Sequence, residues 1–105
     1  MITIYQIPMN GGLAPANVIA AKSDLMLGFN RWKDEYSKMY VRTYEVDTDD
    51  LEQAFESTNL WEDNKVVRHR NGSCTSVGDI AVKDGNCYFC DNYGWVALGK
   101  YEGLN

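Results

Sequence analysis

The chain has 105 residues and a mass of 11.9 kDa, which suffices for one compact domain and excludes a multidomain enzyme. A hydrophobic fraction of 45% with only two prolines excludes extended disorder and low-complexity repeats. The formal net charge of −5 opposes long-range attraction to nucleic acid.

Export and membrane signals are not found in the sequence. It has no apolar run of about 18 residues and no basic segment before an apolar N-terminal block, so we expect no membrane span and no signal peptide. The three cysteines, Cys74, Cys87 and Cys90, are an odd number, which disfavours a disulfide framework. We therefore expect a cytoplasmic protein with reduced thiols.

The N-terminal third predicts two strands joined by a loop. Residues 2–7 are β-branched and aromatic in alternation, which predicts a first strand with Ile2 and Ile4 toward the core. Residues 9–17 contain the turn-forming residues of a loop, and the apolar run 18–21 predicts a short second strand.

The middle of the chain combines a strand pattern with a capped helix. After a helical turn at 25–27, residues 39–46 alternate in the manner of a strand. Asp49 and Glu52 have the spacing of a capping box, which predicts a helix over about 49–58. One face of this helix carries the side chains expected in the core: Leu51, Ala54, Phe55 and Thr58.

The last third predicts a β-meander. Residues 80–83 and 87–90 form two short apolar runs around a turn that contains Asp-Gly, a strong hairpin signal. A second turn at 91–94 leads into a third strand at 95–98.

These elements, with a further strand expected at 65–70, predict the fold class. We expect one α+β domain over residues 1–105: a small antiparallel sheet that ends in a C-terminal β-meander, with one or two short helices packed on one face.

Charge is distributed unevenly along the chain. Residues 45–63 contain eight of the fifteen acidic residues and no Lys or Arg, while the remainder contains ten basic and seven acidic residues. A solvated face on a capped helix accounts for such acids without a ligand. A binding surface for a basic protein, including mimicry of nucleic acid, is the functional interpretation. The eight acids are Glu45, Asp47, Asp49, Asp50, Glu52, Glu56, Glu62 and Asp63.

Aromatic residues offer an anchor beside this acidic segment. The aromatics of the meander alternate, so some of them must face outward, and Tyr and Trp dominate the hot spots of protein interfaces. The expected partner-binding residues are Asp47, Asp49, Asp50, Glu52, Glu56, Tyr93 and Trp95.

A zinc-stabilised module is the first alternative. Its ligands would be His69, Cys74, Cys87 and Cys90, because zinc prefers thiolate and imidazole ligands. Cys87 and Cys90 lie in a strand pattern, however, where residues three apart face opposite sides of a sheet. A calcium loop at 47–58 fails, because it lacks the required Gly and the bidentate Glu. We therefore expect no metal and no cofactor.

Catalytic and nucleic-acid signals are weak. His69 is the only histidine, and it stands between two arginines without a carboxylate that the pattern could assign to it. No Gly-rich phosphate loop is present, so we expect no enzyme. Residues 65–70 form a basic patch that could contact phosphates, and weak nucleic-acid binding is the second alternative. The negative net charge disfavours this second alternative.

The two ends of the chain resemble one family. The runs SVGDIAV at 76–82, DG at 84–85, YFCD at 88–91 and GW at 94–95 resemble the ending of YodL-like small domains, and ITIYQI at 2–7 resembles their first strand. Trp95 stands where Phe is common in that family.

The resemblance implies an accessory protein of a phage or mobile element in the cytoplasm of a bacterial host, and it carries over no catalytic residue. Combined with the charge map, it leads to the expectation of a non-enzymatic protein that binds a host protein through its acidic face. Such a protein would inhibit a defence or nucleic-acid-processing system, in the manner of an anti-CRISPR or anti-restriction protein. The sequence does not determine the oligomeric state.

Overall fold

The structure is a computed structural model that describes residues 1–8, 15–59, 65–69, 72 and 74–100. Its elements follow in the order β1 (Ile2–Gln6), α1 (Ala16–Leu25), the 3₁₀ helices η2 (Phe29–Arg31) and η3 (Asp34–Met39), β2 (Val41–Val46), α2 (Leu51–Asn59), β3 (Val66–Arg68), β4 (Ile80–Lys83), β5 (Asn86–Asp91) and β6 (Gly94–Lys100).

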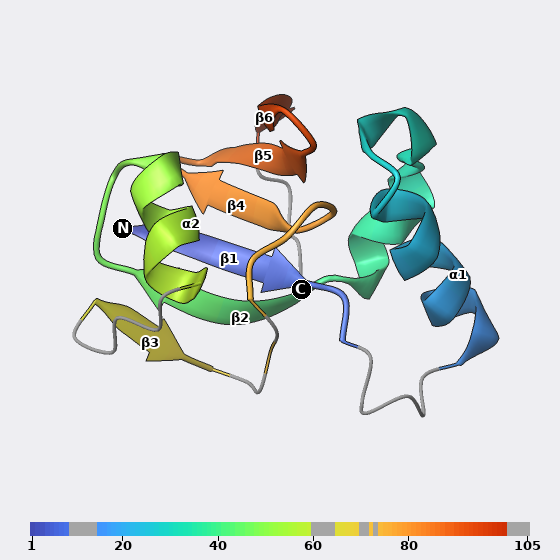
Figure 1. The fold of residues 1–105 in the computed structure, drawn as a ribbon, viewed down its shortest axis with the longest axis horizontal. Coiled ribbons are helices and arrows are strands. Elements are labelled where there is room, and N and C mark those ends of the chain that lie inside the picture. The colour runs from blue at the N-terminus through green and yellow to red at the C-terminus, as the bar shows by residue number, and fades with distance from the viewer. Residues whose placement is uncertain (9–14, 60–64, 70–71, 73, 101–105) are drawn as a thin grey trace.

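The strands form one six-stranded sheet in the order β3-β2-β1-β4-β5-β6, and every neighbouring pair is antiparallel. In the central strand β1 every residue except Thr3 is buried, and β4, β5 and β6 form the meander at one side of it (Figure 1). The predicted α+β class, antiparallel sheet and C-terminal meander are confirmed.

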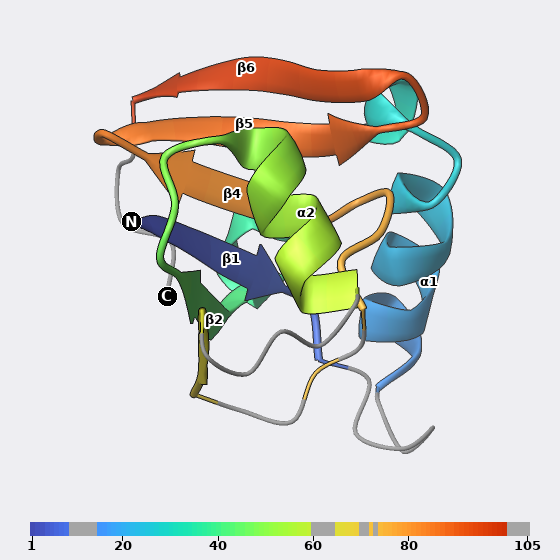
Figure 2. The ribbon, with the colours of Figure 1, turned by 60° about the vertical axis from the view of Figure 1, so that its left-hand side comes forward.

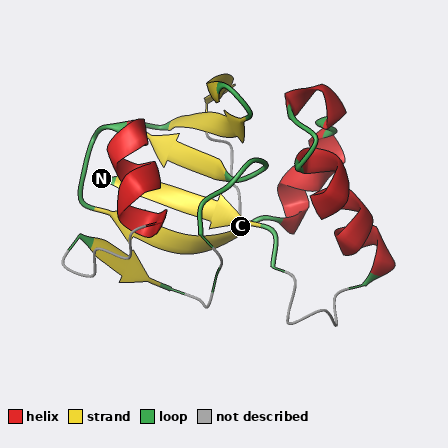
Figure 3. Ribbon diagram, in the orientation of Figure 1, coloured by secondary structure: helices red, strands yellow, loops and turns green. Residues whose placement is uncertain are grey.

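Helices cover both faces of the sheet. In β1, Ile4 packs on the side of α2 while the next residue, Tyr5, packs on the side of α1, as strand alternation requires. The prediction placed the helices on one face; α2 occupies that face, and α1 with η2 and η3 packs against the other. Figure 2 shows α2 lying across the sheet and α1 beside it, and Figure 3 shows the two helical groups well separated.

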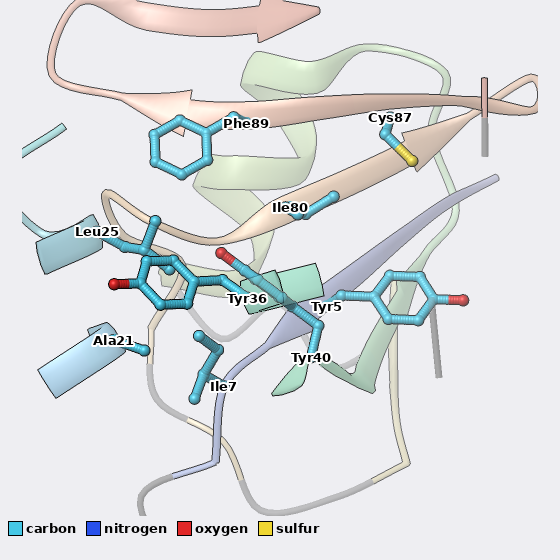
Figure 4. Close-up of a cluster of buried hydrophobic side chains, with 9 residues drawn as sticks. All are labelled: Tyr5, Ile7, Ala21, Leu25, Tyr36, Tyr40, Ile80, Cys87 and Phe89. Atoms are coloured by element: carbon cyan, nitrogen blue, oxygen red, sulfur yellow. The ribbon is translucent and has the colours of Figure 1, made fainter. Parts of the chain in front are cut away.

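Two hydrophobic cores result. The α2-side core consists of Ile2, Ile4, Tyr44, Val46, Ala54, Val66 and Ala81. The α1-side core consists of Tyr5, Ile7, Ala21, Leu25, Tyr36, Tyr40, Ile80, Cys87 and Phe89 (Figure 4). The second core is aromatic: the ring of Phe89 lies 5.4 Å from that of Phe29 and 5.9 Å from that of Trp32, in the tilted and edge-on geometries that aromatic pairs favour.

The strand predicted at 18–21 is wrong, because these residues belong to α1. The helix begins after Pro15, whose carbonyl accepts the amides of Val18 and Ile19 at 3.0 and 3.1 Å. A four-residue apolar run does not distinguish a strand from a buried helical segment. Here the packing of Ala21 and Leu25 into the α1-side core decides for the helix.

The predicted helix at 49–58 is present, but its cap lies one residue later than the Asp49–Glu52 spacing indicated. Asp50 is the cap: its Oδ1 accepts the amide of Gln53 at 3.1 Å, and its own amide donates to Thr48 Oγ1 at 3.1 Å. Of the residues expected in the core, Ala54 and Thr58 are fully buried, and Leu51 and Phe55 are half-buried.

The remaining strands match their predictions with small shifts of their ends. Residues 34–39 form η3, so that β2 begins only at Val41, two residues after the predicted start. The hairpin turn predicted at Asp84-Gly85 is confirmed, because both residues have the positive φ values, 51° and 77°, that a type I′ turn requires. Most of the predicted loop at 9–17 lies outside the described residues, as does Arg70.

Candidate functional site: an acidic surface beside Trp95

The expected acidic residues lie together at the start of α2. Asp47, Asp49 and Asp50 occupy the connection from β2, and Glu52 and Glu56 follow one turn apart on the outer side of the helix. All five side chains are exposed. The helix turns them outward because its opposite side packs on the sheet. We call these five residues the acidic α2 surface.

Two of the five carboxylates have partners within the molecule. Asp49 Oδ1 lies 2.9 Å from the N-terminal ammonium of Met1, a contact that lowers the pKa of Asp49 and raises the pKa of the ammonium. Both groups are exposed, so this pair stabilises the fold only weakly. Asp50 caps the helix.

The other three carboxylates, Asp47, Glu52 and Glu56, form no ion pair within the described part of the chain. Glu52 and Glu56 are also like charges at i and i+4, a spacing that destabilises a helix by about 0.2–0.5 kcal/mol. Of these three residues, Glu52 lies in the first turn of α2, where the helix dipole favours a negative charge, and Glu56 lies outside that turn.

Trp95 borders the acidic α2 surface. Its cross-strand partner on β5 is Cys90, whose thiol is close enough to Glu52 for that carboxylate to help raise the thiol pKa. Trp95 and Leu51 pack against the same α2-side core. The indole is half-buried, so it offers an apolar surface next to the first turn of α2.

Tyr93 lies elsewhere. It is fully exposed at the turn between β5 and β6, which is the end of that hairpin closest to η2 (Figure 2), where Asp91 Oδ1 accepts the amide of Phe29 at 3.2 Å. Trp95 thus packs on the α2-side core, whereas Tyr93 extends into solvent from the turn beside η2.

Glu45, another acid of the segment 45–63, is not part of the acidic α2 surface. It is paired with Thr3 across the β1–β2 ladder and faces the side of the sheet opposite to α2. There its carboxylate lies 3.8 Å from Arg42 Nη1 and 3.5 Å from His69 Nε2. His69 thus has a carboxylate partner that the sequence pattern did not indicate. Glu62 and Asp63 lie outside the described residues.

The four residues of the zinc alternative are separated in space. Cys87 belongs to the α1-side core, Cys90 faces the α2 side, and Cys74 is exposed in the loop before β4. Burial raises the pKa of the Cys87 thiol and, with nearby carboxylates, raises that of Cys90 to about 12. Both thiols are therefore protonated at neutral pH. Among the described residues, no three His, Cys, Asp or Glu side chains are placed to hold a metal ion.

The basic patch at 65–70 is divided by the strand that carries it. Arg68 pairs with Tyr44 and lies on the α2 side at the sheet edge, whereas His69 contacts Glu45 on the other side. Lys65 is half-buried. The strand therefore separates the side chains of Arg68 and His69, the two described basic residues at its end.

A buried polar group around Asp79 was not anticipated. Asp79 is completely buried, and its Oδ2 accepts Gln6 Nε2 at 2.8 Å and the amide of Ser76 at 3.0 Å. Its Oδ1 lies 3.5 Å from Lys22 Nζ and has no hydrogen-bond partner among the described residues. Burial raises the pKa of Asp79, and Lys22 opposes the shift.

Asp79 joins three parts of the fold: α1 through Lys22, β1 through Gln6, and the loop before β4 through Ser76. In the same loop the hydroxyl of Tyr40 donates to the carbonyl of Gly78, and Thr75 shares a 2.5 Å hydrogen bond with Thr58 of α2. The only sequence signal was an acidic residue directly before a buried strand. Asp79 is fully buried, and its contacts connect these three parts of the fold.

Comparisons of the chain with protein-family models, curated proteins and solved structures find no match. The resemblance to YodL-like domains thus stays a prediction. Among the described helices, none has the length and apolar character needed to cross a lipid bilayer.

Proposed function

We propose that this protein is a non-enzymatic binding protein that docks on a basic surface of another protein through its acidic α2 surface, with Trp95 as the apolar anchor. The observation that carries the proposal is a group of exposed carboxylates without ion pairs in the described part of the chain, Asp47, Glu52 and Glu56, beside a half-exposed indole. Complementary charge accelerates association and selects the partner, while a large aromatic side chain supplies affinity.

The partner class follows from the resemblance to YodL-like domains. A phage or mobile-element protein with this surface would bind a host defence or nucleic-acid-processing enzyme, because such enzymes carry basic grooves for phosphate backbones. The acidic α2 surface would occupy part of such a groove and exclude the nucleic acid.

Charge reversal in α2 tests the binding surface. The variant Glu52→Lys/Glu56→Lys removes two carboxylates that have no structural partner in the described residues, and the variant Asp34→Lys/Glu35→Lys makes the same change in net charge on η3. We expect wild type and the η3 variant to capture the same protein from a bacterial lysate, and the α2 variant to lose it. Equal capture by both variants would refute the proposed surface.

A cellular assay tests the defence role. Bacteria that carry a restriction or CRISPR system and express the wild-type protein should plate an attacked phage more efficiently than bacteria that express the α2 variant. Equal plating with both proteins in every defence system tested would refute the proposed inhibition of defence. It would not affect the result of the binding test.

A further inference from the structure

The outer edge of β6 is unusual for the edge of a sheet. β6 is the longest of the described strands, it ends the sheet, and its residues 94–99 carry no charged side chain. In Figures 1 and 2 no described element lies beyond it. The opposite edge, β3, has three residues and includes Arg68. Proteins normally protect free edges with charge, short length or bulges, because an open edge pairs with another strand.

The backbone of β6 directs hydrogen-bonding groups toward this open edge. On β5, the amide of Cys90 donates to the carbonyl of Asp79 (2.8 Å), and the carbonyl of Cys90 accepts the amide of Gly78 (2.9 Å). Both backbone groups of Cys90 therefore point toward β4. In an antiparallel ladder the residue opposite such a position turns its own groups away as well. Trp95 is opposite Cys90, so its N–H and C=O point outward, and those of Ala97 do the same two residues later.

The side chains of β6 fit a second β6 strand that runs antiparallel to it. With Val96 opposite its own copy, Trp95 lies opposite Ala97 and Gly94 lies opposite Leu98. Each of these two pairs joins a large side chain to a small one. Residues that face each other also lie on the same side of the sheet. Trp95 and Ala97 lie on the α2 side, whereas Val96 and Leu98 pack against the α1-side core. In this register Trp95 and Ala97 also bring their outward backbone groups together.

We propose that β6 pairs with β6 of a second copy of this chain about a twofold axis beside Val96, which joins two six-stranded sheets into one. Charge is compatible with a second copy of β6 at this edge, because the paired segment has no charged side chain. The first charged residue of β6 is Lys100, which lies beyond the bulge that follows Ala97. Half-exposed Trp95, Val96 and Leu98 become further buried in the pair. The contact is smaller than a standard interface, so the dimer is weak and concentration-dependent.

The dimer has a consequence that rests on the proposed function. A twofold axis perpendicular to the sheet places both α2 helices on the same side of the joined sheet. Two acidic α2 surfaces would then face one partner together. The pairing of β6 itself does not depend on that function.

Sedimentation across micromolar to millimolar concentrations tests the pairing. We expect the mass of the wild type to rise from 11.9 kDa toward twice that value, and Ala97→Lys, which places a charge in the paired segment at an exposed position, to stay monomeric. The matched control is Val67→Lys, because Val67 is an exposed apolar residue of the opposite edge strand, and it should dimerise like the wild type. A wild type that stays monomeric throughout, or a dimer lost in Val67→Lys and kept in Ala97→Lys, overturns the proposal.

Cross-linking tests the register. In a Cys74→Ser background, Val96→Cys should form a disulfide-linked dimer on mild oxidation, because facing residues next to the axis come within disulfide range. Ala97→Cys should not, because two Ala97 residues would be separated by more than about 7 Å. Cross-linking of Ala97→Cys alone contradicts this register.

The same variants separate the dimer from the proposed function. Capture of the basic partner by monomeric Ala97→Lys would show that the proposed function survives without the dimer. A dimeric wild type that captures nothing would leave the dimer in place and remove that function.

Discussion

The acidic α2 surface and the Asp79 group place the same chemical group, a carboxylate, in opposite surroundings. Glu52 and Glu56 are exposed and form no ion pair within the described residues, whereas Asp79 is fully buried and joins α1, β1 and the loop before β4. An exposed charge stays solvated and remains available to a partner. A buried charge is stable only while its neighbours are all in place. The comparison separates exposed acids, which we propose for binding, from a buried acid whose contacts connect parts of the fold.

Removal of the buried carboxylate should have the largest effect. Asp79→Ala leaves Lys22 charged in a mostly buried position and removes one acceptor from Gln6 Nε2 and from the amide of Ser76, so we expect a loss of about 3–5 kcal/mol in unfolding free energy. Urea unfolding of the wild type and the variant measures this loss. Glu56→Ala should change stability by less than about 0.5 kcal/mol. Similar losses for both variants would erase the distinction between the two regions.

The backbone next to Asp79 should be the next most sensitive position. Gly78 has a φ of 102°, and an added Cβ would lie 3.1 Å from Leu25 Cβ, so Gly78→Ala combines backbone strain with crowding and should cost about 1–3 kcal/mol. Gly85 has a φ of 77° and open space around its Cβ position, so Gly85→Ala isolates the backbone contribution at about 1 kcal/mol. Thermal unfolding of both variants should rank Gly78→Ala as the less stable.

The pH dependence of stability should distinguish the two kinds of acid. The pKa of Asp79 is higher in the folded protein than in the unfolded chain. Its contribution to folding stability is therefore fully present below its unfolded pKa and is lost as pH rises through its folded pKa. Asp49, whose pKa is lowered, contributes above its unfolded pKa and loses that contribution as pH falls. Relative to Asp79→Asn, the wild type should therefore gain stability as pH falls from neutral toward about 4. An unchanged difference between the two proteins over that range contradicts the assignment.

Charge reversal on α2 should have the smallest effect on folding. Glu56→Lys converts a like-charge pair at i and i+4 into an attraction between Glu52 and the introduced ammonium, so the helix should gain about 0.2–0.5 kcal/mol. Chemical unfolding at low and high salt checks this, because the gain should shrink as salt screens the pair. A marked loss of stability would mean that Glu56 has a structural role, and the binding test with the α2 variant would need a different site.

Some of the candidate site could be predicted from the sequence, because exposure of a charged residue on a capped amphipathic helix follows from neighbours three and four positions away. Asp47, Glu52 and Glu56 are exposed as expected. The roles of the other members depended on contacts between distant segments: Glu45 turned to the opposite face because of its register with Thr3, and the turn that holds Tyr93 lies beside η2.

The sequence by itself determined the elements that local chemistry controls. The strand at 2–6, the Asp-Gly hairpin and the helix after Asp50 depend on alternation, turn residues and caps within a few positions of each other. Tertiary structure alone decided that residues 18–21 are helical, that helices cover both faces, and that Asp79 is buried beside Gln6, 73 positions away. The physical reason is that burial and long-range hydrogen bonds depend on which segments pack together, and a local pattern does not contain that information.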